Sequence, residues 1–125
     1  MTPDPGGTGG SMDPDETKDL VLTYWRSWQT SDWEGLRDCL ADTFDMGGMP
    51  MDADEFTAMC ESGTPWKDVE LLSSVFDGDL GAIIYEGTDS KSGNRMRVSE
   101  HAKVVDGKIT HITALIAPRD FNPGA

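Results

Sequence analysis

The strongest constraint on the fold is a two-residue hydrophobic period that runs through the second half of the chain. Alternating apolar and polar side chains are typical of half-buried β-strands, and Asp-Gly pairs are typical of the tight turns between them. Such turns occur at Asp77-Gly78 and Asp106-Gly107, and the polar loop 89–94 separates two further strands. The pattern predicts a meander of antiparallel strands at 69–76, 80–88, 96–105 and 109–116.

The first half has the spacing of amphipathic helices instead. The first helix is expected to begin at Asp13, where Glu16 completes a capping box, and to bury one stripe: Leu20, Val21, Tyr24, Trp25 and Trp28. Similar boxes predict a second helix after Ser31 and a third after Asp52, with a short strand at 44–46 between them. The third helix is expected to bury its apolar residues: Phe56, Met59 and Cys60.

This order of elements predicts the fold class. Helices that precede an antiparallel sheet indicate an α+β domain, in which the helices cover one face of the sheet. At 125 residues the chain is long enough for one hydrophobic core but not for two. We expect a disordered tail at 1–12, rich in Pro and Gly, a domain at 13–117 and a C-terminal tail at 118–125.

Composition excludes several classes of partner and cofactor. The net charge of -13 argues against binding to nucleic acid or to an anionic membrane, because both are polyanions. No apolar run approaches the length of a membrane span and the start has no features of a signal peptide, so a cytoplasmic protein is expected. Cys39 and Cys60 fit no metal or redox spacing, and no phosphate-binding glycine loop is present, so neither a metal nor a cofactor is predicted.

One ionisable residue, Glu100, falls on the apolar phase of its strand. The other residues of that phase are apolar (Met96, Val98, Ala102 and Val104), whereas the opposite phase, which includes His101, is polar. An uncompensated polar group in an apolar interior costs roughly 2–7 kcal/mol. We therefore expect the Glu100 carboxyl to be paired, hydrogen-bonded or protonated, and to mark the candidate site.

The last strand contains two competing apolar phases. A straight continuation from the turn places Ile109, His111, Thr113 and Leu115 inward, but the opposite phase (Ile112, Ala114 and Ile116) is equally apolar. A β-bulge between Ile109 and Ile112 would reconcile the two phases, because one extra residue reverses the side-chain parity. We predict this bulge, which turns His111 outward.

Three parts of the chain resemble the nuclear transport factor two-like superfamily, which includes ketosteroid isomerase and the SnoaL-like polyketide cyclases. They are YWRSWQTSDWEG at 24–35, LAD at 40–42, and SEH at 99–101 with DGKI at 106–109. The resemblance implies a cone-shaped, curved antiparallel sheet wrapped around three N-terminal helices, and a homodimer. It covers nearly all of the expected domain, but it points to no single activity, because the superfamily contains both enzymes and members without chemistry.

The resemblance also implies roles for three residues. Tyr24 matches the helix-one tyrosine of the isomerase and Glu100 matches a protonated strand aspartate, so both would donate hydrogen bonds to an enolate oxygen. Asp45 lies near the position of the general base. If Phe44 is anchored in the core, however, the two-residue period sends Met46 into the pocket and Asp45 outward.

Two functions from different classes follow. The first is an isomerase- or cyclase-like enzyme that transfers a proton on a small hydrophobic carbonyl compound without a cofactor, with Tyr24, Glu100 and Asp45 as catalytic residues. The second is a non-catalytic ligand-binding or structural dimerisation domain, in which Glu100 only stabilises the core. In either case the expected ligand-binding residues are Trp25, Trp28, Met46, Phe56 and Ile112. The tryptophans could instead simply pack in the hydrophobic core without contacting a ligand.

Overall fold

The computed structural model describes residues 13–119, which form the predicted helices and strands in the predicted order, with one further strand, Met49–Asp52, that was not predicted. The helices are α1 (Pro14–Gln29), α2 (Trp33–Asp38) and α3 (Ala53–Ser62). The strands are β1 (Leu40–Met46), β2 (Met49–Asp52), β3 (Trp66–Asp77), β4 (Leu80–Asp89), β5 (Arg95–Val105) and β6 (Lys108–Pro118). The predicted tail 1–12 lies outside the described residues, as does the tail at 118–125 except for its first two positions.

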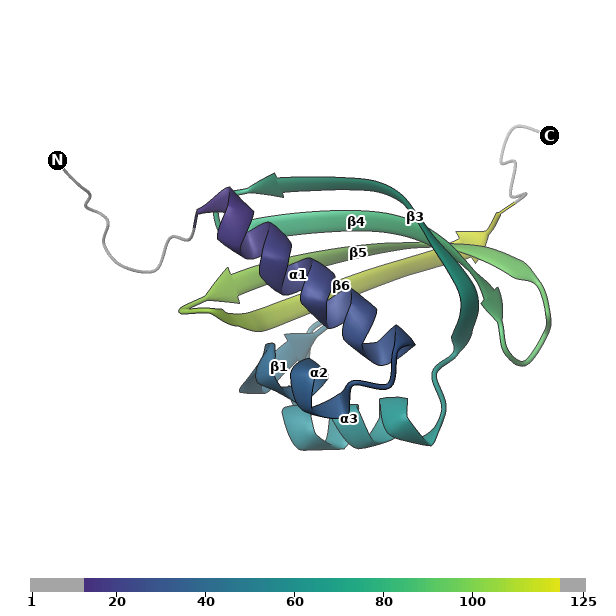
Figure 1. Ribbon diagram of the computed structural model, residues 1–125, viewed down its shortest axis with the longest axis horizontal. Helices are drawn as coiled ribbons and strands as arrows, with labels where there is room; N and C mark the ends of the chain where they lie inside the picture. Colours follow the sequence, from purple (N-terminus) through teal and green to yellow (C-terminus); the bar gives the residue numbers. More distant parts are fainter. Residues whose placement is uncertain (1–12, 120–125) are drawn as a thin grey trace, which may run out of the picture.

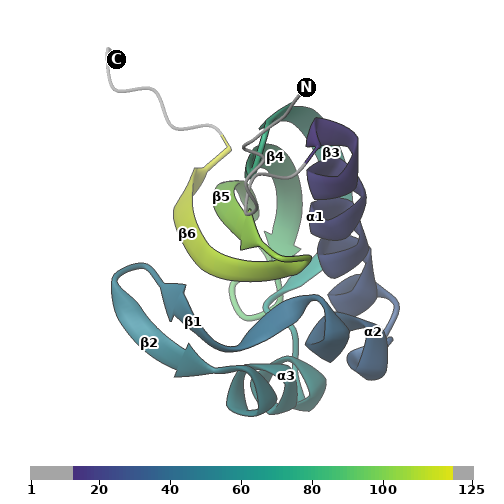
Figure 2. The same cartoon turned by 90° about the vertical axis from the view of Figure 1, so that its left-hand side faces the viewer.

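The strands form one curved sheet in the order β2-β1-β6-β5-β4-β3 (Figure 1). The predicted α+β class is confirmed, and Figure 2 shows α1 lying across the concave side of the sheet, with α3 and the β1–β2 hairpin extending beneath it. Strands β3 to β6 form the expected antiparallel meander. The sheet is not wholly antiparallel, however, because β1 runs parallel to β6. Local turn signals specify only neighbours in sequence, so they did not reveal this distant pairing.

Capping residues set the helix starts. Asp13 caps α1 in the predicted box with Glu16, and Asp52 caps α3 as expected. The start of α2 differs from the prediction, because Asp32 rather than Ser31 is the cap and accepts a hydrogen bond from the Gly35 amide at 3.0 Å. Ser31 instead has a positive φ of 61°, which makes the sharp turn between α1 and α2. The helix α2 therefore begins one residue later than expected.

The predicted bulge in β6 is confirmed. Val104 pairs with Ile109, but Lys103 pairs with His111, so Thr110 is the extra residue. Ile112 is 2% exposed and faces the concave side of the sheet, whereas His111 is exposed on the other side. The bulge thus decides which residues of β6 face the helices.

The convex side of the sheet is left uncovered by the described helices, and it carries exposed apolar residues such as Val75 and Leu115, each 65% exposed. The homodimer implied by the resemblance would cover such a face, but the structure contains one chain and this assembly stays a prediction.

Across residues 13–119, none of the helices combines the length and the hydropathy that crossing a membrane requires.

The bulge can be tested with neighbouring substitutions in β6. Ile112→Asn should lower the free energy of unfolding by about 2 kcal/mol or more, because it buries an amide without partners. His111→Asn should change it by less than about 0.5 kcal/mol, because the side chain is exposed. Urea denaturation of both variants measures the difference, and the reverse order of stabilities would show that β6 is straight.

Candidate functional site

A cavity of about 220 Å³ lies between the helices and the concave side of the sheet. Its wall is almost entirely apolar, with side chains from α1, α3 and strands β1, β3, β4, β5 and β6. The aromatic members are Tyr24, Trp28, Phe56, Trp66 and Tyr85. The cavity opens to solvent beside Met59 and Ile116, which are 56% and 53% exposed although both line it. Met59 is therefore a residue of the pocket mouth, and the expectation that it is buried was wrong.

Glu100 is the one carboxyl among the described residues that line this cavity, and two phenols bind it. The Tyr24 hydroxyl donates to Glu100 Oε1 at 2.9 Å, and the Tyr85 hydroxyl donates to Glu100 Oε2 in a very short hydrogen bond. All three residues are buried, and Glu100 is 7% exposed. The expectation that this inward carboxyl is hydrogen-bonded is confirmed.

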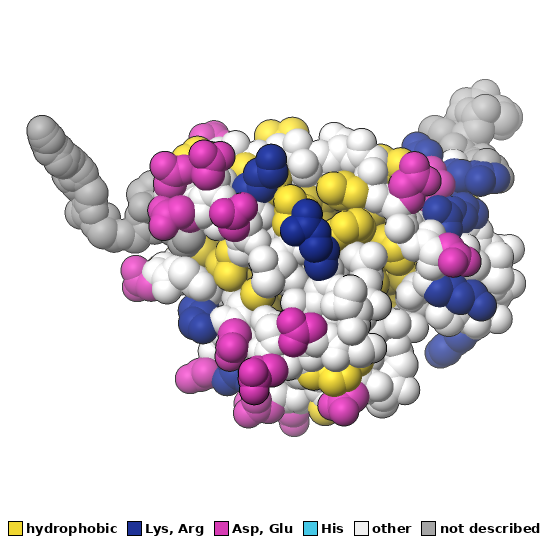
Figure 3. All heavy atoms as spheres, viewed as in Figure 1, with side chains coloured by type: hydrophobic (Ala, Val, Ile, Leu, Met, Phe, Trp, Pro, Cys, Tyr) yellow, Lys and Arg dark blue, Asp and Glu magenta, His cyan; other side chains and the backbone are white. Residues whose placement is uncertain are grey.

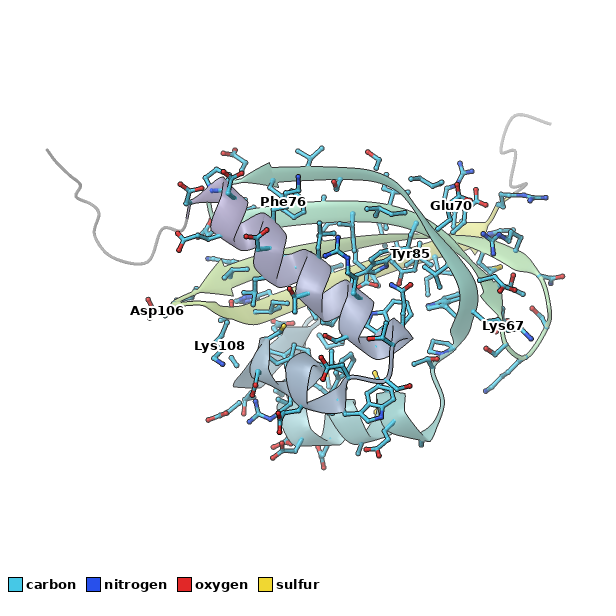
Figure 4. All side chains as sticks on the ribbon, in the orientation of Figure 1. Lys67, Glu70, Phe76, Tyr85, Asp106 and Lys108 are labelled. Carbon is cyan, nitrogen blue, oxygen red and sulfur yellow. The ribbon has the colours of Figure 1, made fainter. Side chains whose placement is uncertain are left out.

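Three elements bring these groups together. Glu100 is on the inward phase of β5, and Tyr85 is on the inward phase of the neighbouring strand, where it pairs with Val98. Tyr24 is on the buried stripe of α1, one turn before Trp28, and α1 crosses the sheet above β4. The Tyr85 ring packs against α1, 6.0 Å from the Trp28 ring between centroids, and Figure 4 shows Tyr85 beside the C-terminal half of this helix. The cluster thus ties the first helix to two central strands.

Burial controls the electrostatics of the cluster. It raises the pKa of Glu100 above the ordinary value, while the hydrogen bonds from Tyr85 and Tyr24 act in the opposite direction. Burial also raises the pKa of both phenols, and the nearby Glu100 charge adds to that effect. Both tyrosines therefore stay protonated up to at least pH 10, which leaves Glu100 as the group of the cluster whose protonation state can change.

A count of protons shows what the cluster offers a ligand. With Glu100 protonated there are three O–H groups, two of which are used in the bonds between the three residues, so one donor remains. With Glu100 ionised, both phenol protons are directed at the carboxylate and only acceptor lone pairs remain. The predicted pair of donors from Tyr24 and Glu100 is therefore reduced to one, because the Tyr24 hydroxyl already donates to Glu100.

Most of the predicted ligand-binding residues line the cavity, namely Trp28, Met46, Phe56 and Ile112. Trp25 does not line it. Its ring packs behind the pocket wall, 5.7 Å from the Tyr85 ring and 6.5 Å from the Trp28 ring, measured between centroids. Trp25 therefore packs in the core, which was the alternative to ligand binding that we considered for the tryptophans.

Asp45 also lies outside the cavity lining. Phe44 is 2% exposed and Met46 lines the pocket, so the strand phase turns the intervening Asp45 away from the pocket, as the two-residue period implies. The Asp45 carboxylate accepts a hydrogen bond from the Gly48 amide at 2.6 Å and so stabilises the β1–β2 turn. The structure therefore does not bring this candidate base to Glu100.

Sequence reasoning missed Tyr85. The signal was available, because Ile83 and Tyr85 share the inward phase of a strand that the 89–94 loop pairs with the Glu100 strand.

Among residues 13–119 no group of three or more His, Cys, Asp or Glu side chains could hold a metal ion.

Comparisons with known proteins bear on the architecture. No family model matches the chain, and no curated protein does either. Solved structures do match, including a protein from Kribbella flavida provisionally assigned as a ketosteroid isomerase, at 17% identity and a TM-score of 0.77, covering 91% of this chain and 87% of that one. An NTF2-like protein of unknown function from Burkholderia xenovorans matches at 17% identity and a TM-score of 0.73, covering 88% and 89%. This chain has the nuclear transport factor two-like (NTF2-like) fold.

Other matches show how widely the NTF2-like fold is shared. IdmH from Streptomyces antibioticus, provisionally assigned as a polyketide cyclase, is 19% identical with a TM-score of 0.64, covering 80% of this chain and 91% of its own. A de novo designed protein with a curved β-sheet is 20% identical with a TM-score of 0.69, covering 86% and 89%. At such identities the likeness establishes the fold, and function has to be argued from the pocket.

The raised pKa of Glu100 predicts a pH-dependent stability. The folded protein binds more protons than the unfolded chain at pH values above the ordinary Glu pKa of about 4.3, so ionisation of Glu100 lowers the free energy of unfolding as the pH rises. Glu100→Gln should therefore gain stability relative to the original protein as the pH rises above the ordinary Glu pKa of about 4.3.

Urea denaturation at several pH values measures this difference. Glu70→Gln, at an exposed glutamate of β3, is the matched control and should follow the original profile. Parallel profiles for Glu100→Gln and the original protein would contradict the burial effect at Glu100.

Proposed function

We propose that this protein binds a small, mostly apolar molecule in the cavity, with the Glu100 cluster as the polar anchor. The observation that carries the proposal is the cluster itself, a buried carboxyl with two phenol donors at an otherwise apolar wall. Apolar pockets with a few convergent polar groups are the usual form of small-molecule sites. A carboxyl that served only to stabilise the core would not need an adjoining cavity.

The cavity volume limits the size of the ligand. An engineered apolar cavity of about 150 Å³ takes up benzene. The volume of about 220 Å³ therefore accommodates one ring with a short substituent, and a longer molecule would extend through the opening beside Met59 and Ile116. Such a ligand would place its ring against the aromatic residues and its polar substituent against Glu100.

Cofactor-free proton transfer on a hydrophobic carbonyl compound is the second candidate. It is favoured by the position of Glu100, a carboxyl that can hold or release a proton next to an apolar ligand. Because Asp45 lies outside the pocket, Glu100 itself would have to abstract the proton. This assigns to Glu100 the role of base instead of the donor role implied by the resemblance.

Ligand-observed NMR with acetophenone, benzyl alcohol and benzylamine tests the binding proposal, since these probes share a ring and differ in the polar group. We expect at least one probe to bind, and Ala114→Trp to abolish that binding because Ala114 lines the cavity. Thr113→Trp, which adds the same ring to the convex side of β6, should leave binding unchanged. The proposal fails if no probe binds or if both variants behave alike.

Deuterium exchange at the methyl group of acetophenone in D₂O tests proton transfer. If the second candidate is correct, Glu100→Gln should reduce the exchange rate to the uncatalysed background, whereas Asp45→Asn should keep more than about half of the original rate because its carboxylate serves the turn. NMR integration follows the loss of the methyl signal. Background exchange with the original protein would leave ligand binding as the function.

A further inference from the structure

Two buried glutamates in the described part of the chain are stabilised in different ways. Glu86, 8% exposed, binds two arginines on the convex side of the sheet, with Arg97 at 2.5 Å and Arg95 at 3.4 Å. Glu100, 7% exposed, has two neutral phenols and no ion pair with a Lys, Arg or His of residues 13–119. Buried charges in proteins are normally paired. The ionised form of Glu100 is therefore missing a counter-ion that Glu86 has.

The pocket wall around Glu100 suits a cation. Five aromatic side chains line the cavity, and the described lining contains no Lys, Arg or His. The faces of aromatic rings carry negative electrostatic potential and attract ammonium groups, most strongly in sites shielded from water. The hydrogen bonds of the cluster agree with this, because both phenol protons already point at the carboxylate and leave only acceptor lone pairs toward the cavity.

The charge of the whole protein acts in the same direction. The chain has a net charge of -13, and acidic side chains are spread over the helical side of the molecule around α1 and below it (Figure 3). A field of this sign raises the local concentration of cations and opposes the approach of anions. An anionic ligand would in addition meet Glu100 without a basic residue to compensate it.

We propose that the ligand of this pocket is a small organic ammonium ion, with an apolar body against the aromatic wall and its N–H groups donating to Glu100. This inference rests on the proposed function and specifies its ligand class. The ammonium supplies the counter-ion that Arg95 and Arg97 supply to Glu86. Where Glu100 carries a proton before binding, that proton passes to the solvent as the ammonium enters, so the bound pair is a carboxylate and an ammonium ion.

Benzylamine and benzyl alcohol test the ligand class, because they share the ring and the chain length and differ in charge. At pH 7.5 we expect benzylamine to bind at least tenfold more tightly than benzyl alcohol, measured by calorimetry or ligand-observed NMR. Glu100→Gln should reduce this preference to less than about threefold. Glu70→Gln removes the same unit of charge from the exposed surface and should keep the preference, which separates pairing in the pocket from general attraction to an acidic protein.

The outcomes distinguish the two proposals. If benzyl alcohol or acetophenone binds as tightly as benzylamine, and Ala114→Trp abolishes that binding, the cation proposal is overturned and the ligand-binding function stands. If none of the probes binds, both fail. The comparison of probes on the original protein requires no variant, so it decides the ligand class even if Glu100→Gln does not fold.

Discussion

Burial of the Glu100 carboxyl is the constraint on which the arrangement of the site depends. A carboxyl on the concave side of a curved sheet has to be hydrogen-bonded there, and the partners come from α1 and β4. Tyr24 can reach Glu100 only if α1 lies across the sheet at the observed position. The same contacts that satisfy the carboxyl therefore keep the helix from filling the concavity, and the cavity lies beside the cluster.

The two sides of the sheet handle acidic residues by different physics. On the convex side, Glu86 is ionised and held by Arg97 and Arg95, which lower its pKa. On the concave side, burial raises the pKa of Glu100 and neutral phenols share its charge. An ion pair next to solvent serves structure, whereas a carboxyl with an adjustable charge next to a cavity is suited to recognition or proton transfer.

Local signals in the sequence were sufficient for most of the fold. The capping residues Asp13 and Asp52, the Asp106-Gly107 turn and the bulge in β6 each follow from a few neighbouring residues, and the structure has all of them. The turn expected at Asp77-Gly78 lies one residue later, because Asp77 still pairs with Leu80 at the end of β3. Pairing between distant segments left no such signal, so the parallel contact of β1 with β6 was missed. The resemblance to the NTF2-like superfamily predicted the overall architecture, but the sheet expected from it was antiparallel throughout and did not include the parallel pairing of β1 with β6.

The candidate site was less predictable than the fold, because it also depends on contacts between segments that are distant in the sequence. Strand phase correctly placed Glu100 inside, Met46 in the pocket wall and His111 outside. Phase alone cannot show which buried residue lines a cavity and which lies behind it, and Trp25 is an example. Tyr85 shows the opposite case, because its phase was readable but its role required the register of two strands to be combined.

The extra residue Thr110 has a consequence for how the lining of the pocket could change during evolution. The stretch of β6 beyond it contributes Ile112, Ala114 and Ile116 to the pocket, while the intervening side chains point to the opposite side. A one-codon insertion or deletion just after Thr110 would exchange these two sets together, because a strand that changes length by one residue reverses the direction of every side chain beyond that point. A family with this bulge could therefore replace much of one pocket wall in a single genetic event, without passing through a series of point substitutions.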